Sequence, residues 1–261
     1  MNPLQNCKNI YFIGIGGIGM SALARYFNKQ GVVVSGYDKT PTLLTDALIK
    51  EGIQIHFEDD LTKIDKQASV IVYTPAIPSN HGELNYFKEN GYLVVKRSDV
   101  LQWITENAFT IAIAGTHGKT TTTSMTAHIL RHTGYGCNAF LGGIASNYGT
   151  NFWSHEKNVV VVEADEYDRS FLKLAPNIAV ITAVDPDHLD IYGTAEEVVK
   201  AFGEFSDKIK TGGWLIRKWN TVFNTLESNK TILTYDYSND KASFHPQHIK
   251  VLDGSYQFDL V

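Results

Sequence analysis

Cysteine is scarce in this chain, because only Cys7 and Cys137 occur among its 261 residues. Two cysteines so far apart in sequence form neither the disulfide framework of a small secreted protein nor a set of metal ligands. A reducing compartment suits such a chain, and we therefore expect it in the cytoplasm.

Basic residues are not in excess either, because 23 Lys and Arg stand against 28 Asp and Glu. This balance argues against a nucleic-acid partner, since nucleic-acid binders usually carry a basic excess. The sequence also contains no run of about 18 apolar residues that would predict a membrane span. The apolar segment at residues 10–20 does not fit a signal peptide, because its closely spaced glycines would break the required helix.

Short β-branched runs alternate with helical patterns along the chain, which predicts an α/β fold with a parallel sheet. In the first part, the expected strands are residues 9–13, 32–37, 53–56, 69–73 and 93–95. The expected helices are residues 18–30, 42–51 and 82–90. A further helix is expected to be capped by Ser98 and to run to about residue 106. From residue 109 the alternation begins again, with expected strands at 109–114, 159–163, 178–183 and 255–261, and expected helices at 120–133 and 194–209, the last capped by Thr194.

The length of the chain suits two domains better than one, because single cores rarely grow beyond roughly 250 residues. We place the boundary near residue 107, which predicts a Rossmann-like domain at residues 1–107 and a second α/β domain at residues 108–261. The chain stops at Val261 within a strand pattern. We therefore expect the second domain to be incomplete.

The first functional motif lies between the strand at residues 9–13 and the helix that follows it. Gly14, Gly16 and Gly19 fit G-x-G-x-x-G, in which glycines allow a tight turn and let backbone N–H groups approach a pyrophosphate. Asp38 ends the next strand, where an acidic residue commonly meets a ribose. The motif predicts a pyrophosphate ligand, which both NAD and UDP carry. A tight turn without a ligand is the alternative.

A second phosphate loop follows the strand at residues 109–114 and opens a helix. Its Gly-Lys-Thr core predicts amides around the phosphates, a lysine against the β- and γ-phosphate oxygens and a threonine hydroxyl on Mg²⁺. The loop is shorter than the usual pattern, which needs glycine where Ile113 stands, and a turn with a solvated lysine is the alternative. The residues expected to bind ATP are Gly115, Thr116, His117, Gly118, Lys119, Thr120 and Thr121.

Carboxylates and a histidine follow two further expected strands. Glu163 ends an apolar run and is placed to hold Mg²⁺, since ligands of open α/β sheets lie at the carboxyl ends of the strands. Glu166 and Asp168 fit a solvated acidic loop equally well. His188 stands among aspartates, and we weigh a second metal ligand against a structural histidine.

Four segments resemble the Mur ligases in their order and residues: GIGGIGMSALA at 14–24, GTHGKTT at 115–121, EADE at 163–166 and DPDHLD at 185–190. The resemblance runs over essentially the whole chain. It implies a UDP-binding Rossmann-like domain, a central P-loop ATPase-type domain and a C-terminal domain. This chain would hold the first of these and most of the second.

The resemblance also implies a reaction in which ATP phosphorylates the lactyl carboxylate of UDP-N-acetylmuramate. The amine of L-alanine then attacks the acyl phosphate, and phosphate leaves. Lys119 would contact the γ-phosphate, Thr120 and Glu163 would hold one Mg²⁺, His188 would hold a second, and His117 would help to position the substrate. The residues implied to contact the UDP part are Gly16, Gly17, Ile18, Gly19, Asp38, Thr74, Pro75 and Ala76.

Two departures from the family pattern leave alternatives open. Tyr167 stands where many relatives carry serine, and relatives that recycle murein tripeptides also have tyrosine there, so L-alanine and a tripeptide are both possible acceptors. Residues 213–224 lack the Asn-x-Asp-Asp that some relatives place near adenine. Because the third domain would carry most amino-acid contacts, we expect this chain to bind UDP-N-acetylmuramate without completing the ligation.

Two functions of other classes compete with the ligase. A nicotinamide dehydrogenase would use the first phosphate loop for NAD, but it leaves Lys119, Glu163 and His188 without a role. A P-loop switch protein would use the second loop and would need no UDP site, so that replacing Gly16 would leave its function intact.

Overall fold

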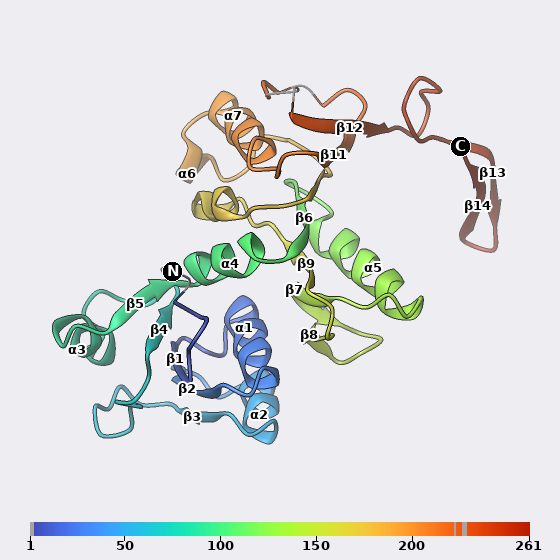
Figure 1. Ribbon diagram of the computed structural model, residues 1–261. Coiled ribbons are helices and arrows are strands. Elements are labelled where there is room, and N and C mark those ends of the chain that lie inside the picture. The colour runs from blue at the N-terminus through green and yellow to red at the C-terminus, as the bar shows by residue number, and fades with distance from the viewer. Residues whose placement is uncertain (1–2, 222, 226–228) are drawn as a thin grey trace. The chain divides into compact units, whose positions relative to one another are not determined.

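The computed structural model describes residues 3–221, 223–225 and 229–261 (Figure 1). The chain divides into two compact units, one made of the residues up to Ala108 together with Ser124–Val161, the other of Phe109–Thr123 and Val162–Val261. Within the described residues, no helix is both long and apolar enough to cross a lipid bilayer. The domain boundary near residue 107 stays a prediction.

The first unit contains a five-stranded parallel sheet in the order β3-β2-β1-β4-β5. Its strands are β1 (Asn9–Ile13), β2 (Val33–Tyr37), β3 (Gln54–His56), β4 (Val70–Tyr73) and β5 (Leu93–Lys96), and its helices include α1 (Ile18–Lys29), α2 (Leu43–Lys50), α3 (Gly82–Glu89) and α4 (Arg97–Glu106). The strand order reverses between β1 and β4, which opens a crevice beyond their carboxyl ends. The loop after β1 and the loop after β4 meet there, because a methyl group at Gly14 would lie 3.1 Å from Thr74.

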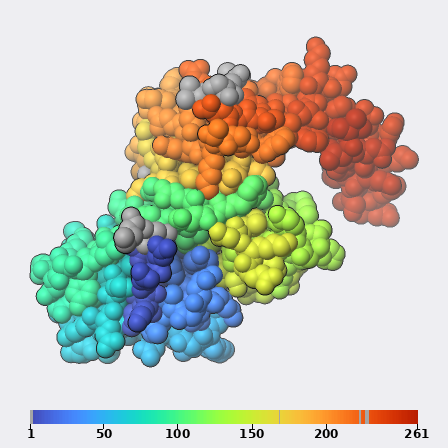
Figure 2. Space-filling model, in the orientation of Figure 1, coloured from blue at the N-terminus to red at the C-terminus, as the bar shows by residue number. Residues whose placement is uncertain are grey.

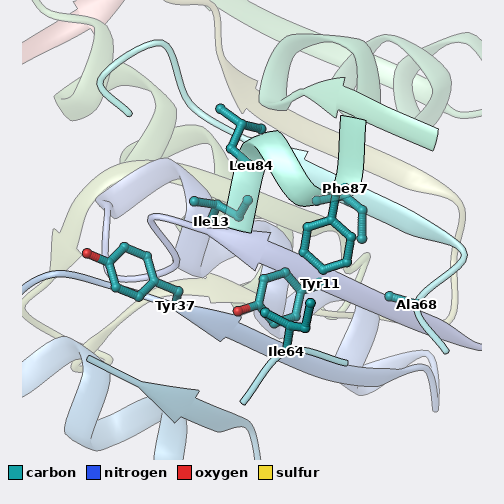
Figure 3. Close-up of a cluster of buried hydrophobic side chains, with 8 residues drawn as sticks. Tyr11, Ile13, Tyr37, Ile64, Ala68, Leu84 and Phe87 are labelled. Atoms are coloured by element: carbon teal, nitrogen blue, oxygen red, sulfur yellow. The ribbon is translucent and has the colours of Figure 1, made fainter. Parts of the chain in front are cut away.

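A buried cluster stabilises one face of this sheet, where the side chains of β1 meet those of α3 (Figure 3). Tyr11 and Phe87 are fully buried, with ring centroids 5.2 Å apart. Side chains alternate along a strand, so Tyr11 and Ile13 share this face. The Tyr11 hydroxyl donates to the buried Glu83 carboxylate at 2.6 Å. Burial, together with this carboxylate, raises the pKa of Tyr11.

The second sheet has the strand order β12-β11-β10-β6-β9-β7-β8. Its strands are β6 (Phe109–Ala114), β7 (Asn138–Ala145), β8 (Thr150–Trp153), β9 (Val159–Glu163), β10 (Ile178–Ile181), β11 (Gly213–Lys218) and β12 (Lys230–Tyr235). The helices along this part of the chain are α5 (Lys119–His132), the 3-10 helix η1 (Tyr167–Lys173), α6 (Leu189–Tyr192) and α7 (Ala195–Ser206). The neighbouring strands β6, β10, β11 and β12 are parallel, so the α/β fold class is confirmed.

A separate antiparallel hairpin joins β13 (Pro246–Leu252) to β14 (Ser255–Leu260). Its side chains are largely exposed along both strands (dark red in Figure 2). A two-stranded hairpin buries little apolar surface, so packing within the hairpin contributes little to the stability of the fold.

The sequence patterns located most elements before residue 210 to within a few residues, but they did not define β11, β12 and β13. The prediction that Ser98 caps a helix is wrong, because α4 begins at Arg97 with Lys96 as its N-cap, whose N–H donates to the Asp99 carboxylate at 2.8 Å. Strand β5 runs directly into α4, so the end of the strand sets the start of the helix. The patterns also did not indicate the antiparallel pair β7 and β8. Thr194 does cap α7, accepting from the Glu197 N–H at 3.3 Å.

Candidate functional site

The first phosphate loop joins β1 to α1. The N–H groups of Gly14 and Ile15 both donate to the Tyr37 carbonyl, at 2.7 and 3.0 Å. Gly14 has a φ of +85°, a conformation that glycine adopts without strain. The Gly16 N–H donates to the Asp38 carboxylate at 2.7 Å. Asp38 therefore orients the backbone of the loop that was expected to meet a pyrophosphate.

A pocket of about 680 Å³ opens over this loop, within the usual size of small-molecule sites. Its lining includes several of the residues implied to contact the UDP part, namely Gly16, Gly17, Asp38, Thr74 and Ala76. Ile18, Gly19 and Pro75 are not among its lining residues. The structure thus brings together the two glycines, the end of β2 and the loop after β4.

Three side chains near this pocket belong to no sequence motif, and the sequence did not indicate them. Lys39 and His81 line the pocket. Arg97 does not line the pocket but lies against the first turn of α1, since a methyl group at Gly19 would clash with its Nη1 atom. The absence of a side chain at Gly19 lets the Arg97 guanidinium lie against the start of α1. The only signal for Lys39 was its place directly after Asp38.

The second phosphate loop joins β6 to α5 in the other unit. Gly115 has a φ of +136°, and a methyl group there would lie 2.0 Å from the Thr182 hydroxyl. The Thr116 N–H donates to the Ala183 carbonyl at 3.0 Å. At Gly118 the nearest atom to such a methyl group is Thr182 Cβ, at 4.0 Å. The loop is therefore held firmly at its start and has open space at its turn, where a phosphate could enter.

Lys119 is held at the first position of α5 by two acceptors. Its ammonium group donates to the Gly115 carbonyl at 2.7 Å and to the Glu166 carboxylate at 2.8 Å. Glu166 is fully buried, so the interpretation of this residue as part of a solvated acidic loop is wrong. The chain turns from β9 into η1 here, and the Tyr192 hydroxyl donates to the Glu166 carbonyl at 2.6 Å. Nothing in the sequence near Glu166 indicated these long-range contacts.

The two side chains expected to hold the first Mg²⁺ lie together, because the Thr120 hydroxyl donates to the Glu163 carboxylate at 2.9 Å. His188 lies near Glu166 instead, with its Nε2 atom 3.7 Å from Oε1. It has a φ of +51°, which is uncommon for a residue other than glycine. His117 is exposed, with its Nε2 atom 3.8 Å from the Asp185 carboxylate. Thr121 is exposed on α5.

The donor set fits a hard cation with few protein ligands. Among the residues that the structure describes, no group of three or more His, Cys, Asp and Glu side chains is arranged to hold a metal ion. A nucleotide-bound Mg²⁺ needs only one or two protein oxygens, because phosphates and water supply the others. Thr120 and Glu163 offer such oxygens. The buried Oε2 atom of Glu166 has no hydrogen-bond partner among the described residues.

Comparison with protein families accounts for both phosphate loops. Residues 9–108 match the family described as Mur ligase family, catalytic domain, and residues 113–261 match the Mur ligase middle domain. The chain belongs to the Mur ligase family. The order of motifs in the sequence had indicated this family, and that prediction is confirmed.

Curated relatives of this Mur ligase share about half of its residues. UDP-N-acetylmuramate–L-alanine ligase from Porphyromonas gingivalis is 51% identical over 258 residues, which are 96% of this chain and 57% of the relative. The enzyme of the same name from Phocaeicola vulgatus is 49% identical, over 99% of this chain and 57% of the relative. The chain therefore spans little more than half the length of these relatives.

Solved structures agree with the fold. UDP-N-acetylmuramate–alanine ligase from Thermotoga maritima superposes with a TM-score of 0.81 and 26% identity, over 98% of this chain and 58% of that one. A UDP-N-acetylmuramate:L-alanyl-γ-D-glutamyl-meso-diaminopimelate ligase from Neisseria gives a TM-score of 0.84 at 23% identity, over 97% and 84% of the two chains. At that identity, the second likeness shows the fold alone.

The buried contact between Glu166 and Lys119 predicts a large loss of stability when the carboxylate is neutralised. Glu166→Gln is expected to lower the free energy of unfolding by about 3 kcal/mol, because removing one partner leaves the other charge poorly solvated. The matched control is Glu197→Gln, which breaks the exposed pair between Glu197 and Arg169 and is expected to cost far less, because solvent screens exposed pairs. Urea denaturation measures both, and equal losses would contradict a structural role for the buried pair.

Proposed function

We propose that this chain is the UDP-substrate-binding and ATP-binding part of a ligase that joins L-alanine to UDP-N-acetylmuramate in peptidoglycan precursor synthesis. The observation that carries the proposal is the pairing of two phosphate loops on two α/β units, each at a strand–helix junction. A dehydrogenase or a switch protein needs only one of these loops. The names of the curated relatives support the choice of substrates.

The division of labour follows from the two loops. Residues 1–107 would bind the UDP part, with the amides around Gly16 and Gly17 against the diphosphate, and residues 108–261 would bind ATP. Such a substrate carries several negative charges, and helix N-termini with convergent amides stabilise them. A cytoplasmic location fits the two free thiols, Cys7 and Cys137.

The chemistry would proceed in two transfers. A carboxylate oxygen of UDP-N-acetylmuramate attacks the γ-phosphorus of ATP, the bond to the bridging oxygen breaks, and ADP leaves. The amine of L-alanine then attacks the activated carbonyl carbon, phosphate departs with the former carboxylate oxygen, and the nitrogen loses a proton. Activation converts a poor leaving group into a good one.

Residues of this chain would act mainly through charge and position. The Lys119 ammonium neutralises charge that develops on the transferring phosphoryl group. Thr120 and Glu163 would hold Mg²⁺, and His188 is the proposed ligand of a second ion. These ions would supply further charge neutralisation at the phosphates. His117 extends from the second loop into solvent, where a substrate carboxylate could reach it.

The reaction itself tests the proposal. A protein that extends this chain to the length of its relatives is given ATP, Mg²⁺ and UDP-N-acetylmuramate with L-alanine, glycine or L-alanyl-γ-D-glutamyl-meso-diaminopimelate. Phosphate release and the product mass are then recorded. We expect release that depends on L-alanine and on the UDP substrate together. Phosphate release that requires the tripeptide and does not occur with L-alanine would make the tripeptide the acceptor. Phosphate release without any UDP substrate would refute the ligase.

A further inference from the structure

A second pocket in the first unit, of about 470 Å³, is lined by none of the residues of either phosphate loop. It has the size of a small-molecule site. Its walls come from the C-terminal part of α1, the residue directly after α2, the end of α5 with the loop that follows it, and β8 with the residues that follow it. The proposed ligase reaction gives this pocket no role.

Cationic side chains dominate the charge of this pocket. Arg25, Lys29 and Arg131 line it, and Glu51 is the only carboxylate among its lining residues. The guanidinium of Arg25, which is 5% exposed, donates to both oxygens of Glu51 at 2.9 and 3.0 Å. The charge of Glu51 is therefore compensated. Lys29 and Arg131 leave the pocket with a net positive charge.

Arg131 is held in place by aromatic rings. Its guanidinium lies over the ring of Tyr148 at 4.3 Å and over that of Trp153 at 5.3 Å, measured to the ring centroids. A stacked guanidinium keeps its N–H groups in the plane of the group, free to point at an anion. This positioning lowers the conformational entropy that Arg131 would lose on binding a ligand.

The neutral groups of the pocket also offer donors. The indole Nε1 atom of Trp153 is buried; it makes a weak hydrogen bond to the thiol of Cys137 and has no oxygen or nitrogen partner among the described residues. His155 accepts from the Lys157 N–H through its Nδ1 atom at 3.2 Å. Because Nδ1 is used as an acceptor, Nε2 is the donor position of the His155 ring. A pocket rich in donors and poor in charged acceptors is complementary to an anion.

From this charge and donor pattern, we propose that the pocket binds a small organic phosphate. Guanidinium groups match the geometry of phosphate oxygens, and a pocket of this volume has room for an organic group beside the phosphate. The apolar lining of Phe152 and Trp153 faces that remaining volume.

The pocket has a direct structural connection to the first phosphate loop. The Arg25 guanidinium also donates to the side chain of the fully buried Asn151. The Asn151 amide in turn donates to the Ile18 carbonyl at 2.5 Å and to the Ser21 hydroxyl at 2.9 Å, in the first turn of α1. A ligand that contacts Arg25 is thus two hydrogen bonds away from the helix end that carries the loop, which is a suitable place for a regulatory metabolite.

The proposal is tested by titrating this chain with inorganic phosphate and with phenyl phosphate while following the Trp153 indole N–H signal by NMR. The signal is assigned with Trp153→Phe. We expect a saturable shift that chloride at equal ionic strength does not cause, with tighter binding of phenyl phosphate. Arg131→Ala and Lys29→Ala should each weaken binding at least tenfold. The backbone amide NMR spectra of the two variants show whether each one folds. If only one of them folds, that variant is sufficient for the test.

Two control variants separate this pocket from the phosphate loops and from the general surface. Lys119→Ala should leave the Trp153 shift unchanged, because Lys119 is not among the residues of this pocket. Lys66→Ala removes a different surface cation that also lies over an aromatic ring, that of Tyr86, and should have no effect. A shift that is absent, that chloride reproduces, or that keeps its wild-type affinity in a folded Arg131→Ala or Lys29→Ala variant would overturn the proposal. Equal affinity for inorganic phosphate and phenyl phosphate would overturn the claim that the ligand carries an organic group.

Discussion

Replacing Lys119 with alanine is expected to lower the turnover of the ligase by roughly 10³-fold or more, because charge stabilisation is the dominant contribution to phosphoryl transfer. The Lys119 ammonium is the cation at the start of α5, next to the open turn at Gly118. Without this ammonium group, the negative charge that develops on the γ-phosphate oxygens would lose the cation that is expected to neutralise it. Turnover is measured as phosphate release in a protein extended to the length of the relatives.

A loss of folding must be separated from a loss of chemistry in this variant. Lys119→Ala also leaves the Glu166 carboxylate buried without its partner, so the variant is destabilised as well. The double variant Lys119→Ala, Glu166→Gln removes that buried charge and should recover stability without recovering turnover. Lys200→Ala, which removes an exposed lysine paired with Glu197, should keep wild-type turnover. Turnover of Lys119→Ala within a few-fold of wild type would refute the assignment.

Replacing Gly115 with alanine is expected to weaken ATP binding by about 100-fold, which corresponds to roughly 3 kcal/mol. Its φ of +136° is rarely adopted by L-residues. The added methyl group would also lie 2.0 Å from the Thr182 hydroxyl and 2.9 Å from the Ala183 nitrogen. The loop would have to move away from β10, which would displace the amides that are expected to surround the phosphates. Calorimetric titration of this chain with ATP and Mg²⁺ measures the effect.

Gly212→Ala is the matched control for this substitution. Gly212 lies in the same unit and has a φ of +79°, but a methyl group there would meet no atom within 4 Å. It should therefore cost only about 1 kcal/mol of backbone strain and leave ATP affinity unchanged. Equal ATP affinity in Gly115→Ala and wild type would show that the loop does not contact the nucleotide.

Local patterns were sufficient to locate the phosphate loops and most elements. Each loop is specified by glycine spacing at a strand–helix junction, and both features lie within about ten residues of sequence. The strands at residues 9–13, 109–114 and 159–163 match the observed β1, β6 and β9. Continuous apolar runs of this length specify buried parallel strands. Glu163 was placed beside Thr120 by the same logic, because strand ends converge at one edge of a sheet.

Contacts between distant residues decided what the patterns left open or got wrong. The sequence left a solvated acidic loop open for Glu166, yet Lys119 and Tyr192 contact this buried residue from positions far along the chain. Arg97 reaches Gly19 because it directly follows β5, and the carboxyl ends of the parallel strands β1, β4 and β5 share one edge of the sheet.

The sequence by itself determined the family, the α/β class and the positions of both glycine-rich loops. These properties depend on short-range backbone geometry and on hydrophobic periodicity, which neighbouring residues encode. Only the tertiary structure decided which charges are paired and buried, and where the cationic pocket around Arg25 and Arg131 forms. Burial and pairing depend on which side chains meet in space, and residues far apart in sequence make those contacts.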